Sequence, residues 1–199
     1  VDALSLLGRN PNLRKRGAQA AKTAWKFVAD TTSSAEVIAF FDDDACLMDH
    51  IIPDDVITPD GRIIARGMMI TGPESASFQA GFRHWEKHSE WFGLAVTNVS
   101  YMVEFPVVVW REMITDFRAH VNGFVHGKHG DPSVELFLEA YTMVHLKHHA
   151  WLICEFCLLL NFAEGSPKWR HRYRFDKWPE TSPMVVYAVH HFSVCPRPK

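Results

Sequence analysis

The most apolar stretch of the chain runs from Ala150 to Phe162, and it limits how the chain can fold. A membrane-spanning helix needs about 18–20 consecutive apolar residues, whereas this stretch is shorter and is interrupted by Glu155 and Asn161. It therefore predicts a buried strand or a core helix, and we interpret residues 151–162 as a strand of a sheet. The Glu155 carboxylate lies in an apolar setting, so its charge needs a partner or must be neutralised.

Composition indicates an ordinary globular protein. Hydrophobic residues make up 47% of the 199 residues and charged residues 22%, which suits one domain with a substantial core. With 21 basic and 23 acidic residues the net charge is -2, so we expect neither nucleic acid nor a membrane as a partner. The first residues lack the order of a secretory signal peptide, and a cytoplasmic location is the expectation.

Cys154 and Cys157 have the C-x-x-C spacing that occurs in redox and zinc sites. No second C-x-x-C accompanies them, and on the expected strand their side chains would point to opposite faces. We therefore interpret both cysteines as small buried apolar residues.

Helices are predicted early in the chain and strands dominate its second half. The expected helices are 18–29, 36–41 and one that follows the start signal at Thr71. The expected strands are 46–52, 62–66, 92–105, 107–121, 134–150, 151–162 and 168–175, with one more in the tail at 184–194. The segment 134–150 has two interpretations. Asp131, Pro132 and Glu135 resemble a helix start, but the alternation of apolar residues favours a strand.

Three segments carry a resemblance to a known family: AEVIAFFDDDACLMDHI, GRIIARG and NFAEGSPKWRHRYRFDKW. In the order of elements over residues 18–178, the chain resembles the nuclear transport factor 2-like superfamily, in particular its SnoaL-like polyketide-cyclase branch. The resemblance implies an α+β fold in which a cone-shaped, curved antiparallel β-sheet wraps around N-terminal helices, a cystatin-like α+β barrel. Residues 1–17 and 179–199 are then extensions, and a homodimer is implied by analogy.

Histidine is the informative residue for chemistry, because its charge changes near neutral pH and the chain has twelve copies. Only one of the neighbours Asp49 and His50 can face a pocket from a strand. Residues 110–120 would form one polar network on a strand face, unless that face is the solvated outside of the sheet. The predicted catalytic residues are Asp49, His50, His84, His88, Glu112, Asp116, Arg118 and His120.

Aromatic and polar side chains elsewhere are candidates for binding a substrate. Tryptophans can stack on a planar or cationic intermediate, although large aromatic residues also fill cores without such a role. The predicted substrate-binding residues are Trp85, Trp91, Trp110, Tyr141, His145, Trp151, Glu155 and Trp169.

The leading functional expectation is a cofactor-independent enzyme that acts on a hydrophobic polyketide- or terpenoid-like molecule in natural-product biosynthesis. General acid–base catalysis by His, Asp and Glu would drive cyclisation, isomerisation or dehydration. No nucleotide-binding motif is present, and neither a cofactor nor a metal is expected. Two alternatives stay open. One is a non-catalytic small-molecule binding module. The other is a metalloprotein whose ligands come from Glu135, Glu139, His145, His148, His149, His84 and His88.

Overall fold

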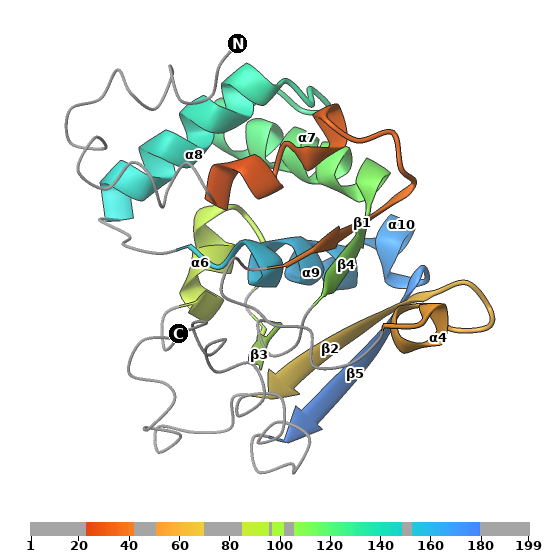
Figure 1. The fold of residues 1–199 in the computed structure, drawn as a ribbon. Coiled ribbons are helices and arrows are strands. Elements are labelled where there is room, and N and C mark those ends of the chain that lie inside the picture. The colour runs from red at the N-terminus through yellow and green to blue at the C-terminus, as the bar shows by residue number, and fades with distance from the viewer. Residues whose placement is uncertain are drawn as a thin grey trace, which may run out of the picture.

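The computed structural model describes residues 23–41, 51–69, 85–95, 97–101, 106–148 and 153–179, and these form an α+β fold. Three longer helices lie on one side of the molecule, and the strands lie beside and below them (Figure 1). Within the described residues, no helix is long and apolar enough to cross a membrane.

Strands of the described part form two small sheets. The first pairs β1 (Val37–Phe40) with β4 (Val107–Trp110) in an antiparallel manner. In the second, β2 (Ile63–Met69) lies between β3 (Val99–Ser100) and β5 (Tyr173–Pro179). The β2–β5 pairing is parallel and the β2–β3 pairing is antiparallel. The α+β class is confirmed, whereas these two sheets do not confirm the cone-shaped barrel.

The helical layer consists of α7 (Arg111–His126), α8 (Val134–His148) and α9 (Glu155–Gly165). Shorter helices surround it: η1 (Ala29–Thr31), α4 (Pro53–Val56), α6 (Trp85–Trp91) and α10 (Pro167–Arg170). Phe27 joins the first residues to this layer, because its ring lies 5.2 Å from that of Phe117 and 5.3 Å from that of Phe137 between centroids. Aromatic packing therefore holds α7 and α8 against the described amino-terminal segment.

The predicted long strand 107–121 is wrong beyond Trp110, where α7 begins. Met113, Phe117 and Val121 are all fully buried on this helix. Residues four apart share one face of a strand, whose period is two, and also lie near one face of a helix, whose period is 3.6. The pattern of apolar residues therefore fitted both a strand and a helix. Gly127, in the left-handed conformation with φ 68°, ends the helix.

Two further strand predictions are also wrong, because 134–148 and 155–165 are the helices α8 and α9. For the first segment, the helix alternative is correct. Phe137, Tyr141 and Val144 recur at helical spacing on the buried face of α8. The apolar run around Glu155 forms α9, which is buried on nearly all sides, and such a run does not reveal its period.

Predictions for the remaining segments have mixed outcomes. The helix 36–41 is wrong, because Val37 and Ile38 pair with β4, and β-branched residues favour strands. The strand 62–66 is confirmed as part of β2. The segment 168–175 divides into α10 and the start of β5, and 92–105 contributes only the two residues of β3 among those described. The strands 46–52 and 184–194 and the helix after Thr71 lie mainly outside the described residues.

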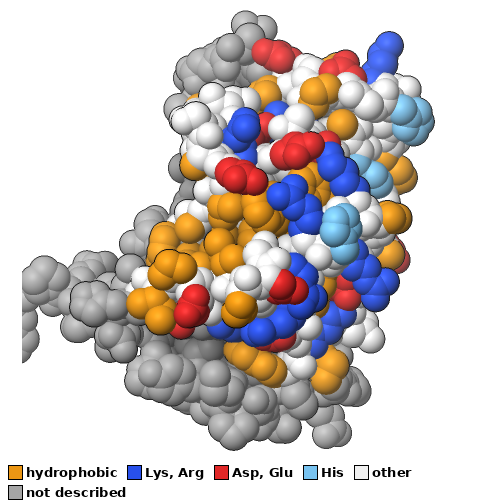
Figure 2. All heavy atoms as spheres, turned by 90° about the vertical axis from the view of Figure 1, so that its right-hand side faces the viewer, with side chains coloured by type: hydrophobic (Ala, Val, Ile, Leu, Met, Phe, Trp, Pro, Cys, Tyr) orange, Lys and Arg blue, Asp and Glu red, His pale blue; other side chains and the backbone are white. Residues whose placement is uncertain are grey.

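One face of the protein, the side that carries α4 and α10, combines apolar and charged side chains. Hydrophobic side chains form a continuous area there, and charged side chains of both signs border it (Figure 2).

Candidate functional site

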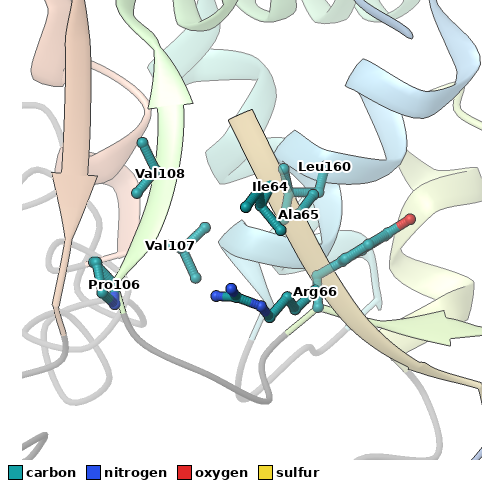
Figure 3. Close-up of a pocket in the computed structure, with 8 residues that line it drawn as sticks. Ile64, Ala65, Arg66, Pro106, Val107, Val108 and Leu160 are labelled. Carbon is teal, nitrogen blue, oxygen red and sulfur yellow. The ribbon is translucent and has the colours of Figure 1, made fainter. Parts of the chain in front are cut away.

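A hollow between β2 and β4 is the candidate binding site (Figure 3). The hollow is small and shallow: about 10 Å³ is accessible to the centre of a water-sized molecule, and its roughly 280 Å³ of empty space includes open solvent. Most of its lining residues have apolar side chains, although polar atoms make up more than half of the surface exposed in the hollow. The lining residues are Ile64, Ala65, Arg66, Tyr101, Pro106, Val107, Val108 and Leu160.

Incomplete strand pairing creates this hollow. Along β2, β5 covers one edge from end to end, but β3 covers the other edge only at Met68 and Met69. β1 pairs with one edge of β4, and in the described part of the chain no strand pairs with its other edge. The β2 segment around Ile64 and the β4 segment around Val108 therefore face each other without forming a ladder, and the space between them stays open at one side.

Arg66 supplies the positive charge of the hollow. Its guanidinium lies between the two strands (Figure 3), and its Nη2 donates a hydrogen bond of 2.7 Å to the backbone oxygen of Asp55 in α4. That bond fixes the side chain beside the apolar walls. A guanidinium has five donors in a planar arrangement, and such a group recognises carboxylates and phosphates through charge-assisted hydrogen bonds.

A second group of polar residues lies in the core at the amino end of α9. The Lys26 ammonium forms an ion pair with the Glu155 carboxylate, and both side chains are at most 10% exposed. The ammonium also lies 4.0 Å above the centroid of the Phe156 ring. The predicted need of Glu155 for a partner is therefore confirmed.

Tyr141 and His145 adjoin this ion pair from α8. The two rings stack with centroids 5.8 Å apart, and both residues are buried. Burial raises the pKa of the Tyr141 phenol, the Glu155 charge raises it further, and the nearby Thr23 side chain opposes both effects. The phenol therefore stays protonated at neutral pH. Three predicted substrate-binding residues, Tyr141, His145 and Glu155, thus come together, but none of them lines the hollow.

The predicted catalytic network on residues 112–120 is not brought together as expected. Glu112 and Asp116 lie one turn apart on α7 and accept bonds of 2.8 and 2.7 Å from the Lys168 ammonium. Hydrogen bonding to Lys168 lowers the pKa of the Glu112 carboxyl, and both acids raise the pKa of the Lys168 ammonium. This network lies at the surface between α7 and α10, because helical spacing directs these acids away from the core.

Arg118 and His120 lie on the same helix but do not take part in the network of Glu112, Asp116 and Lys168. The Arg118 guanidinium is buried and pairs with Asp30, while His120 Nε2 lies 3.2 Å from the backbone oxygen of Phe92. The geometry favours a structural role for Arg118, since its donors connect three segments of the chain.

Predicted aromatic and histidine residues form two stacks. Trp91 lies between His88, at 4.5 Å, and His148, at 4.2 Å between ring centroids. Burial and the nearby Lys147 lower the pKa of His148, so its ring is neutral at pH 7. In the second stack, the Arg172 guanidinium lies 3.7 Å from the centroid of the Trp110 ring and 5.2 Å from that of Trp169.

The other site predictions are outside what the structure describes. Asp49, His50, His84 and Trp151 lie outside the described residues, and the side chain of Trp85 is not described. Among the described residues, no group of three or more His, Cys, Asp and Glu is placed to hold a metal ion.

Sequence reasoning missed the residues that define the hollow. Arg66 was visible as a charged residue within the apolar strand segment RIIAR, but its position beside β4 depends on contacts distant in sequence. Comparison of the chain with protein-family models, curated proteins and solved structures finds no match. We therefore infer function from the contacts of the described residues.

Proposed function

We propose that the protein binds a small apolar molecule that carries an anionic group, in the hollow between β2 and β4. The observation that carries this proposal is the Arg66 guanidinium beside otherwise mainly apolar walls. Burial of the ligand's apolar part contributes about 25 cal/mol per Å². The guanidinium pairs with the anionic group and selects it over a neutral one. Among the described lining residues there is no His, Asp or Glu, which favours binding over acid–base catalysis at this position.

Arg66→Gln is expected to weaken binding of a medium-chain alkyl carboxylate about tenfold or more, because loss of a charge-assisted bond amounts to about 1.5–3 kcal/mol. The affinity for the alcohol of equal chain length is expected to stay unchanged. Isothermal titration calorimetry with both ligands measures the difference.

Arg62→Gln is the matched control, since Arg62 lies two residues before the strand segment at the hollow, does not line it, and pairs with Asp60 at 2.8 Å. Equal affinities of the two variants for the carboxylate would contradict the proposal. The absence of any binding to the unmodified protein would contradict it as well.

A second candidate is the cofactor-independent acid–base enzyme of the cyclase, isomerase or dehydratase type that acts on a hydrophobic polyketide- or terpenoid-like molecule. The proximity of Lys26, Tyr141 and Glu155 in an apolar core supports it, because exclusion of water strengthens the electrostatic interactions on which acid–base catalysis depends. A cone-shaped fold shared with nuclear transport factor 2-like proteins stays a prediction, and neither function depends on it.

The enzymatic candidate predicts isomerisation of a β,γ-unsaturated cyclic ketone to its conjugated form, followed by ultraviolet absorbance. Tyr141→Phe is expected to reduce the rate by 100-fold or more, as is typical of losing a general acid. Glu139→Gln, an exposed acid on the same helix, is the control. An unmodified protein that never exceeds the buffer rate would exclude this activity.

A further inference from the structure

We infer that Cys154 and Cys157 form a redox pair that closes to an intramolecular disulfide. The two sulfur atoms lie 2.7 Å apart at the amino end of α9. A disulfide bond is about 2.05 Å long, so only a small movement separates the two thiols from the bonded state.

Local geometry of the helix start brings the two sulfurs together. Cys154 is the N-cap residue of α9, and its sulfur accepts a hydrogen bond of 3.2 Å from the backbone N–H of Cys157. Residues three apart lie on the same side of a helix, whereas on a strand they would point to opposite faces. The expectation that the two side chains point to opposite faces of a strand is therefore wrong, whereas the prediction that both are small buried residues is confirmed.

Burial decides which oxidant can reach the pair. Both cysteines are at most 2% exposed, and desolvation raises the pKa of the Cys154 thiol well above its ordinary value. A protein disulfide cannot make contact with sulfurs this deep, so exchange with a partner protein is excluded in the native state. A small hydroperoxide is the chemical class of oxidant that fits.

The hollow gives a route for this oxidant. Leu160 lines the hollow, and Cys157 lies three residues earlier on α9, on the same side of the helix. Tyr101 also lines the hollow and lies near Cys157. The inferred route passes the wall that Leu160 and Tyr101 form in the hollow.

The reaction consumes one hydroperoxide for each disulfide. The sulfur of one thiol attacks the peroxide oxygen and loses its proton, the O–O bond breaks, and the released alkoxide or hydroxide takes up that proton and leaves as an alcohol or water, which gives a sulfenic acid. The second sulfur then attacks the first, the S–O bond breaks, and water leaves as the S–S bond forms. The two sulfurs lose two electrons in total, and these reduce the peroxide.

The test uses the full chain with Cys46→Ser and Cys195→Ser, so that only the pair is left. The reduced protein is treated with hydrogen peroxide, alkylated with N-ethylmaleimide under denaturing conditions and analysed by mass spectrometry. The expected product has lost two hydrogen atoms, takes up no maleimide and returns to the dithiol with dithiothreitol. Two maleimide additions after treatment, or a cross-link between two chains, would overturn the inference.

A second comparison tests the route through the hollow. Leu160→Ala opens the wall and is expected to accelerate disulfide formation several-fold, whereas Leu159→Ala removes an equally buried side chain that does not line the hollow. Circular dichroism shows whether each variant is folded. Equal acceleration by both folded variants would overturn the route. Binding of the alkyl carboxylate to the unmodified protein is measured separately, so that failure of the proposed function is distinguished from failure of this inference.

Discussion

Arg118→Ala is expected to lower the free energy of unfolding by about 3–5 kcal/mol, because it leaves a buried carboxylate without its partner. The side chains of Arg118 and Asp30 are only 4% and 6% exposed. Besides the ion pair, Arg118 donates bonds of 2.8 Å to the Phe27 oxygen and 3.0 Å to the Pro132 oxygen. One guanidinium thus holds α7 to the segment before η1 and to the loop before α8, and urea unfolding measures the loss.

Arg174→Ala is the control for the removal of an arginine from an ion pair. Arg174 binds Asp176 at 2.8 Å, but its side chain is 45% exposed, so the expected loss is about 0–1 kcal/mol. A catalytic role for Arg118, as predicted from the sequence, would instead leave stability near that of the unmodified protein. Similar midpoints for Arg118→Ala and Arg174→Ala would therefore contradict the structural role.

Lys26→Met is the second substitution with a large expected effect, a loss of about 3–5 kcal/mol in the free energy of unfolding. The substitution removes the ammonium that pairs with the Glu155 carboxylate in the apolar interior, together with its contact to the Phe156 ring. Glu155→Gln is expected to be harmful for the converse reason, since it removes the carboxylate that pairs with the Lys26 ammonium.

The double variant Lys26→Met/Glu155→Gln separates the ion pair from general packing. If the two charges depend on each other, the double variant is expected to be more stable than the sum of the two single losses predicts, by about 0.5–3 kcal/mol. Urea unfolding of all four proteins gives this coupling energy. Additive losses would show that the pair does not act as a unit, and would weaken the case for the core cluster as a proton-transfer site.

Local sequence signals were sufficient to predict the secondary structure of segments that have one favourable backbone conformation. The strand at 62–66 follows a turn in which Gly61 adopts φ 81°, a conformation that glycine tolerates and other residues rarely adopt. By contrast, the pattern of apolar residues fitted both a strand and a helix in three segments, 107–121, 134–150 and 151–162. Their helical state follows from the way α7 packs against both α8 and α9, which a local pattern does not contain.

The sequence was sufficient to predict an α+β protein without a long apolar helix, and to show that Glu155 required a partner in the core. It could not name Lys26 as that partner, because 129 positions separate the two residues along the chain. The hollow between β2 and β4 and the contact of Cys154 with Cys157 were also beyond local prediction. Composition and spacing restrict which residues must be buried or paired, but only the packing of distant segments decides which groups meet.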